Sequence, residues 1–255
     1  MREPAACGII RNELFYQLPS IFHPARTGVE RTSPKSLRRL RSRRSFPFHS
    51  KRKEVLNADT IIEARWVIPV APKGVILDNT SVVISDGRII DLLPISEART
   101  KYSAPEVVSL PESALLPGFV NLHSHAAMNL VRGLGADLPL MDWLTKKIWP
   151  AEGKLMSPEF VREGSWLAGL EMAAGGVTTT SDHYFFPKAA AEGLRSAGLR
   201  CAVSGIVIGF PSAWAKNDAE YLEKSEALIR EFEGDRFIHA TIAPHAPYTV
   251  SDDSL

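Results

Sequence analysis

The chain has 255 residues, 45% of them hydrophobic, which is enough to form a large core in one large domain or two smaller ones. Its formal net charge of +1 is unevenly distributed, since residues 1–53 carry 13 Lys and Arg against 3 Asp and Glu, and residues 54–255 carry 17 against 26. The acidic part is therefore not expected to bind nucleic acid, and no apolar stretch approaches the length of a membrane span.

The basic segment at residues 1–53 has no sustained apolar periodicity and is centred on the Arg- and Ser-rich run at 38–45. Such a composition does not bury enough apolar area to order itself. We expect a disordered basic extension without a function of its own. An organellar transit peptide and a nucleic-acid-binding arm are the alternatives, in that order.

The two cysteines, Cys7 and Cys201, form no C-x-x-C motif, and Cys201 lies in an apolar run typical of a buried thiol in a reducing compartment. The N-terminus lacks the hydrophobic region of a secretory signal. We therefore expect a soluble cytoplasmic protein that binds no membrane.

Short β-branched segments begin near residue 57, and Asp86-Gly87 is a strong signal for a hairpin turn. The spacing of strands and turns predicts a small antiparallel, sandwich-like β unit over residues 54–115, closing with a strand within 104–115. It contains no cluster of titratable groups, so we interpret it as a scaffold.

Two histidines follow a Pro-Gly turn and a short apolar run, in the pattern His123-Ser124-His125. Side chains two apart on a strand point to the same face, so both imidazoles are aimed at one point, as in half of a metal site. If the strand belongs to a parallel barrel, the inward set is Phe119, Asn121, His123 and His125, and the outward pair is Val120 and Leu122. The alternative is a pair of satisfied core or surface histidines, since H-x-H alone is a weak motif.

Helical and strand patterns then alternate, which favours a parallel sheet or barrel of about four strand–helix repeats. The expected elements are a helix capped by Ser157 and ended by Gly175-Gly176, a strand at 177–182, a helix at 187–197, a strand at 201–208, a helix capped by Asp218 and ended at Gly234, and a strand at 237–243. The fold class is therefore α/β: the N-terminal half of a (β/α)8 TIM-type barrel over residues 116–255, beside the small β domain.

Residues 57–255 resemble the N-terminal part of the 5′-methylthioadenosine/S-adenosylhomocysteine deaminases of the amidohydrolase superfamily, which also contains guanine deaminase and s-triazine hydrolases. The matching segments are 57–66, 116–133, 141–144, 149–152 and 243–249. The resemblance implies that His123 and His125 are metal ligands, that Trp143 and Glu152 contact the nucleoside through its apolar part and its ribose hydroxyls, and that His245 binds substrate. Core packing for Trp143 and a solvated helix-end charge for Glu152 are the alternatives.

The family's chemistry is metal-assisted hydrolytic deamination of a small nucleoside, in which one divalent metal ion, most often zinc, lowers the pKa of a bound water. Residues 237–248 contain no Lys that could bridge two metals, which favours a mononuclear site. The family's third metal ligand and proton shuttle match no residue here, so no catalytic residue is assigned, and we expect the chain to be inactive alone. A guanine deaminase or triazine hydrolase activity, or a non-catalytic truncated product that forms a homo-oligomer or docks a partner, is the alternative. His183 and His239 match no ligand of the family and are interpreted as structural, His239 as a packed residue.

Overall fold

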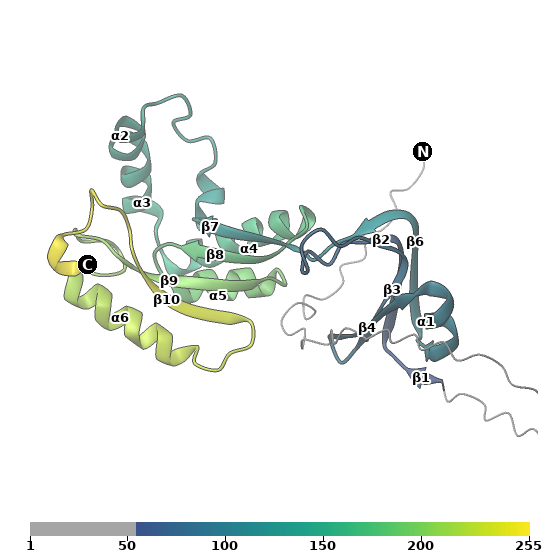
Figure 1. The fold of residues 1–255 in the computed structure, drawn as a ribbon. Coiled ribbons are helices and arrows are strands. Elements are labelled where there is room, and N and C mark those ends of the chain that lie inside the picture. Colours follow the sequence, from purple (N-terminus) through teal and green to yellow (C-terminus); the bar gives the residue numbers. More distant parts are fainter. Residues whose placement is uncertain (1–54) are drawn as a thin grey trace, which may run out of the picture. The chain divides into compact units, whose positions relative to one another are not determined.

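The structure is a computed structural model that describes residues 55–255, so the expectations for residues 1–53 lie outside it. The described residues divide into two compact units, 55–116 and 117–255 (Figure 1). Each unit is described by itself below. Within residues 55–255, no helix combines the length and apolar character needed to cross a membrane.

The first unit is a twisted mixed sheet with one short helix. Its elements are β1 (Leu56–Asn57), β2 (Thr60–Val67), β3 (Leu77–Ser85), β4 (Arg88–Pro94), α1 (Ile95–Lys101), β5 (Tyr102–Ser103) and β6 (Glu106–Leu115). The main sheet has the order β4-β3-β2-β6, and β1 pairs with β5 in a second, two-stranded sheet. The β2–β3 and β3–β4 pairs are antiparallel, but β6 pairs with β2 in parallel, in contrast to the expected all-antiparallel unit. Helix α1 supplies the crossover that a parallel pair requires.

The predicted hairpin joins β3 to β4 at Asp86-Gly87. Both turn residues have positive φ angles, 50° and 66°, as a type I′ turn requires, and Asp and Gly are residue types that tolerate such angles. The Asp86 N–H donates to Asp59 Oδ2 at 2.6 Å, which ties the turn to the start of β2.

One carboxylate lies inside this unit. Glu63 on β2 is 3% exposed, and it accepts hydrogen bonds from Arg99 Nε at 2.8 Å and Arg99 Nη2 at 2.7 Å. The Arg99 guanidinium on α1 thus neutralises the charge of the buried carboxylate through a bidentate contact.

The second unit is a parallel sheet in the order β10-β9-β8-β7 (Figure 1). Its elements are β7 (Phe119–Ser124), the 3-10 helix η1 (Ala126–Val131), α2 (Leu140–Trp143), the π-helical turn η2 (Leu144–Ile148), α3 (Trp149–Leu155), α4 (Pro158–Ala174), β8 (Val177–His183), α5 (Pro187–Ser196), β9 (Arg200–Val207), α6 (Asp218–Glu231), β10 (Ile238–Pro244) and the 3-10 helix η3 (Asp252–Ser254). Because each strand is followed by its sequence neighbour and crossovers are right-handed, α4, α5 and α6 cover one face of the sheet. All four carboxyl ends lie at one edge.

The helix boundaries follow the expected capping signals closely. The Ser157 hydroxyl accepts from the Phe160 N–H at 3.1 Å, and Pro158 occupies the first turn of α4 as predicted. At α6 the cap is Asn217, whose Oδ1 accepts from the Glu220 N–H at 3.0 Å, one residue before the Asp218 that was expected. Asn and Asp are both good N-cap residues, so residue type does not distinguish Asn217 from the adjacent Asp218.

Small residues allow α4 to approach its neighbours closely. A Cβ built on Gly164 would lie 2.5 Å from the carbonyl oxygen of Ala127 in η1. A Cβ built on Gly193 of α5 would lie 2.3 Å from the carbonyl oxygen of Arg162 in α4. Helix α4 therefore holds both η1, which directly follows His125, and α5 through backbone contact.

Candidate functional site

Strand β7 changes its register just before the H-x-H motif. Its pairing with β8 shifts between Asn121 and Ser124. The Asn121 amide lies 3.9 Å from Met172 Sδ of α4, so Asn121 faces the helices and the expectation that it faces inward was wrong. Leu122, expected to be covered by helices, is 80% exposed. Irregular pairing of this kind re-aims side chains next to active sites. Here it lies directly before the two histidines, which stand at the carboxyl end of the strand.

Four histidines form a continuous cluster at that end. The ring centroids of His123 and His125 are 4.8 Å apart, those of His125 and His183 are 5.9 Å apart, and those of His183 and His245 are 5.8 Å apart. The cluster spans β7, β8 and the residue after β10. His123 and His245 thus lie at the same end of the sheet, as predicted. His183, interpreted from sequence as structural, lies between the predicted metal pair and the predicted substrate-binding histidine.

The ring of His125 is oriented by the backbone of the neighbouring strand. Its Nδ1 hydrogen-bonds the carbonyl oxygen of His183, so Nδ1 carries the proton and Nε2 keeps a free lone pair. Burial, the largest cause, and nearby His123 lower the pKa of His125. A neutral imidazole held by a carbonyl is the arrangement of a metal-binding histidine, so His125 fits a ligand of a divalent metal. The His123 ring lies 4.8 Å away by centroid distance and is placed to be a second ligand.

A larger ligand set is not assembled in this part of the chain. Among residues 55–255, no three His, Cys, Asp or Glu side chains are arranged to hold a metal ion. Catalytic zinc sites use about three protein ligands. The two histidines therefore fit part of such a site.

Asp182 fixes the turn that carries His125. Its carboxylate is 1% exposed, and its Oδ1 accepts from the Ala126 N–H at 2.7 Å and the Ser124 hydroxyl at 2.9 Å. Burial raises the pKa of Asp182 to about 6, against the opposing effect of these hydrogen bonds. Both neighbours of His125 are thus attached to β8, Ala126 through its backbone N–H and Ser124 through its hydroxyl.

Glu152 reaches the cluster through a tyrosine. The buried Tyr184 hydroxyl, two residues past Asp182, donates to Glu152 Oε1 at 2.6 Å, and the Tyr184 ring centroid lies 6.1 Å from that of His125. Burial raises the pKa of Glu152, and the hydrogen bond from Tyr184 acts in the opposite direction. Glu152 is therefore a half-buried group joined to the site, and its contact rules out a solvated charge at a helix end.

Trp143 lies apart from the histidines. Its indole N–H donates to the Leu134 carbonyl oxygen at 2.8 Å, and the ring lies close to Gly135. Between residues 55 and 255 no ring contact joins Trp143 to the histidine cluster. The π-helical turn η2 directly follows Trp143, and such turns are frequent at functional sites.

His245 is held in place at the start of the loop after β10. Its backbone N–H donates to the Val207 carbonyl oxygen at 2.9 Å, and its ring Nδ1 lies 2.8 Å from Thr249 Oγ1. Burial and the nearby histidines lower the pKa of His245. His239, which was expected to be packed, is exposed on β10 and takes no part in the cluster.

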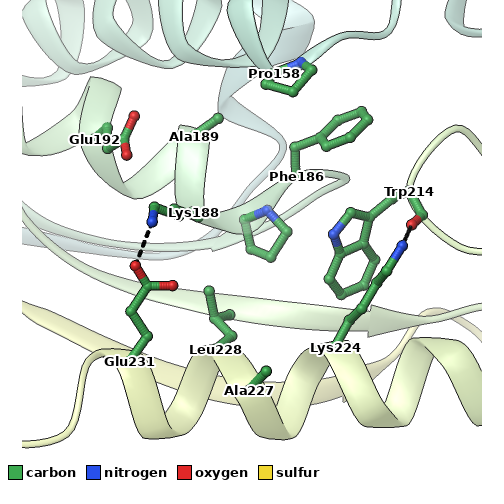
Figure 2. Close-up of a pocket in the computed structure, with 11 residues that line it drawn as sticks. Pro158, Phe186, Lys188, Ala189, Glu192, Trp214, Lys224, Ala227, Leu228 and Glu231 are labelled. Atoms are coloured by element: carbon green, nitrogen blue, oxygen red, sulfur yellow. Dashed lines mark hydrogen bonds and ion pairs between the residues drawn. The ribbon is translucent and has the colours of Figure 1, made fainter.

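A cavity in the second unit lies away from the histidine cluster. It measures about 430 Å³ and opens between α5 and α6, with Trp214 and Phe186 as aromatic walls (Figure 2). In its lining, Lys188 pairs with Glu231, and Lys224 donates to the Trp214 carbonyl oxygen (Figure 2). It contains none of the histidines, so the candidate site is the cluster and not this cavity.

Comparison with known proteins identifies relatives of the whole described region. A 5-methylthioadenosine/S-adenosylhomocysteine deaminase of Saccharophagus degradans is 42% identical over 198 residues, covering 78% of this chain and 44% of that protein. A 5′-deoxyadenosine deaminase of Methanosarcina mazei is 38% identical over 201 residues, covering 78% and 45%. A crystal structure of a Xanthomonas campestris adenosine deaminase with bound zinc matches with a TM-score of 0.76 at 41% identity, covering 79% of this chain and 46% of that one.

This chain therefore spans less than half the length of the relatives it matches. The structural match confirms the expected fold class, with four strands and their helices forming part of an amidohydrolase (β/α)8 barrel. Residues 114–255 match the model of the Amidohydrolase family. With that match covering more than half of its residues, the chain belongs to the amidohydrolase family.

Proposed function

We propose that this chain forms part of a metal-dependent hydrolytic deaminase that acts on an adenosine thioether, either methylthioadenosine or S-adenosylhomocysteine. The observation that carries the proposal is the link from Glu152 through Tyr184 to His125. It connects a carboxylate suited to ribose hydroxyls with the histidine pair suited to a metal. The names of the relatives support a nucleoside as the substrate.

The residues have distinct roles in this proposal. His123 and His125 hold one divalent metal ion, with zinc favoured because a structural relative contains it. When bound, such an ion supplies a Lewis acid that makes hydroxide available near neutral pH. Tyr184 occupies one oxygen of Glu152 and orients the other toward the ribose hydroxyls. His245 contacts the substrate from the last strand, and Trp143 offers an aromatic surface to its apolar part.

The test separates the ribose from the base. The substitution Glu152→Gln removes the negative charge of the carboxylate, which accepts hydrogen bonds from the ribose hydroxyls, and keeps the shape of the side chain. In a complete protein that carries these segments, we expect the variant to raise KM for methylthioadenosine by about tenfold and to leave KM for a bare purine unchanged. Equal effects on the two substrates would remove the ribose role and favour a guanine deaminase or triazine hydrolase type of substrate.

A second candidate concerns the chain by itself. We propose that the 255 residues alone do not release ammonia from methylthioadenosine at a useful rate. In this proposal they either need a partner that completes the site or are a truncated protein without catalytic activity. The support is the absence, within residues 55–255, of three side chains arranged to hold a metal ion. The purified chain can be assayed for bound zinc and ammonia release, and robust turnover would contradict this second proposal.

A further inference from the structure

One nitrogen at the centre of the histidine cluster has no partner. His183 is 9% exposed, and its Nε2 is a buried side-chain atom without a hydrogen bond. Within residues 55–255 the other two such atoms are the hydroxyls of Ser81 and Ser165. A buried polar atom without a partner costs about 1–3 kcal/mol, so it calls for an explanation.

The position of this nitrogen points to a ligand. The His183 ring lies between that of His125, at 5.9 Å, and that of His245, at 5.8 Å. These two neighbours are the proposed metal ligand and the proposed substrate contact. An ionised imidazole without a counter-charge would be much more costly in this place, so the ring is neutral.

Two structural explanations of His183 are weak. Its backbone carbonyl already orients His125, and any residue at this position would supply that carbonyl. As a metal ligand it would form a group of three with His123 and His125, but no group of three in the described part of the chain is arranged to hold an ion. In the ligand-free protein the His183 imidazole contacts the backbone of Ala243, and its Nε2 is left without a hydrogen-bond partner.

We propose that His183 Nε2 hydrogen-bonds the nitrogen heterocycle of the substrate. The inference rests on the proposed function and extends it, since Glu152 then recognises the sugar and His183 the base. A neutral imidazole nitrogen donates to a ring nitrogen in one tautomer and accepts from an amino group in the other. Both groups belong to an aminopurine.

The test is equilibrium binding to the zinc-loaded 255-residue chain, with methylthioadenosine and adenine as probes. His183→Met fills the space without a hydrogen-bonding group. It is expected to weaken the binding of both probes by about tenfold in Kd. His183→Gln, which retains a polar group near the same place, is expected to restore most of the affinity. Glu152→Gln is expected to weaken methylthioadenosine only.

A measurement of stability distinguishes a role of His183 in binding from a role in stabilising the fold. Replacing an unpartnered buried nitrogen with an apolar group is expected to leave the urea midpoint unchanged or to raise it. His239→Met serves as the control on β10, which β9 separates from the strand of His183, and is expected to alter the binding of neither probe. Unchanged affinity of both probes for His183→Met, or a lower midpoint in that variant, would overturn this inference alone. If the unsubstituted chain binds neither probe, the proposed function falls as well.

Discussion

The two units of the molecule each bury a carboxylate, and they stabilise it in different ways. Glu63, in residues 55–116, receives both hydrogen bonds from a guanidinium that carries the opposite charge. Asp182, in residues 117–255, receives its bonds from a backbone N–H and a hydroxyl, both neutral. The first unit thus cancels its buried charge, as a scaffold does. The second uses its polar groups to position a loop and leaves its histidines available for a ligand.

The contrast is tested most strongly by removing the Asp182 carboxylate. Asp182→Ala leaves the Ala126 N–H without an acceptor in a buried place and removes one of the acceptors of the Ser124 hydroxyl, which still reaches the Ser181 carbonyl oxygen. We expect a loss of about 3 kcal/mol in the free energy of unfolding, measured by urea denaturation. Asp182→Asn keeps an acceptor oxygen and is expected to cost about 1 kcal/mol.

The counterpart is Glu63→Gln in the other unit, which breaks a bidentate ion pair. It is expected to lower the unfolding midpoint of residues 55–116. If neutralising Glu63 had no effect while Asp182→Asn were as severe as Asp182→Ala, the two units would not differ in the way described.

The second test concerns the close backbone contact between Gly164 of α4 and Ala127 of η1. In Gly164→Ala the new methyl group meets the Ala127 carbonyl oxygen at 2.5 Å, and neither backbone segment can move aside easily. We expect a loss of about 2 kcal/mol in stability. The matched control is Gly153→Ala in α3, where nothing lies within 4 Å of the new methyl group. That variant is expected to stabilise by about 0.5–1 kcal/mol through helix propensity. Losses of equal size in both variants would show that close packing is not the cause.

A smaller effect is expected from Tyr184→Phe, which removes only the hydroxyl that donates to Glu152. A hydrogen bond to a charged group contributes about 1.5–3 kcal/mol, and Glu152 keeps partial access to water, so we expect a loss near 1 kcal/mol. The same change removes the interaction that opposes the raised pKa of Glu152. The pKa of Glu152, followed by carboxylate NMR, is therefore expected to rise further. An unchanged pKa would mean that the two groups are not coupled.

The smallest effect concerns the dependence of stability on pH, in which the contributions of Asp182 and His183 nearly cancel. The pKa of Asp182 is raised to about 6 from 3.8, so its contribution is fully present below about pH 4 and is lost as the pH rises through 6. The pKa of His183 is lowered to about 4 from 6.5 by burial and by its histidine neighbours. Its contribution is present above pH 6.5 and is lost as the pH falls through 4.

These opposite slopes can be separated in the metal-free chain. Asp182→Asn is expected to lose stability more steeply than the unsubstituted chain between pH 6.5 and 4, and His183→Met less steeply. Urea midpoints at several pH values measure both slopes. Parallel curves for the two variants would contradict the assignment of these pKa shifts.

Local signals in the sequence predict most of the secondary structure. The hairpin at Asp86-Gly87, the cap at Ser157 and the order of the four parallel strands all follow from short patterns. The parallel pairing of β6 with β2 could not be predicted, because strand composition does not specify the direction of a partner 46 residues away, as in the pair Thr60 and Glu106. The register shift in β7 also has no sequence signal, since each residue from 121 to 124 fits a regular strand.

The candidate site was predicted only in part, for the same reason. The pairing of two histidines in H-x-H is local, so His123 and His125 were found. His183 was assigned a structural role because its significance depends on contacts with β7 and the end of β10, which are distant in sequence. The link from Tyr184 to Glu152 likewise joins residues 32 positions apart, and only the fold brings them together.

The order of strands in the second unit allows the site to be built in the order of synthesis. Each of β8, β9 and β10 pairs with the strand that precedes it in the chain, so each pairing can form as soon as its strand leaves the ribosome. His125 acquires its orienting carbonyl when β8 docks on β7. His245 joins only when β10 has paired, so the histidine cluster is complete only after every strand before it is in place.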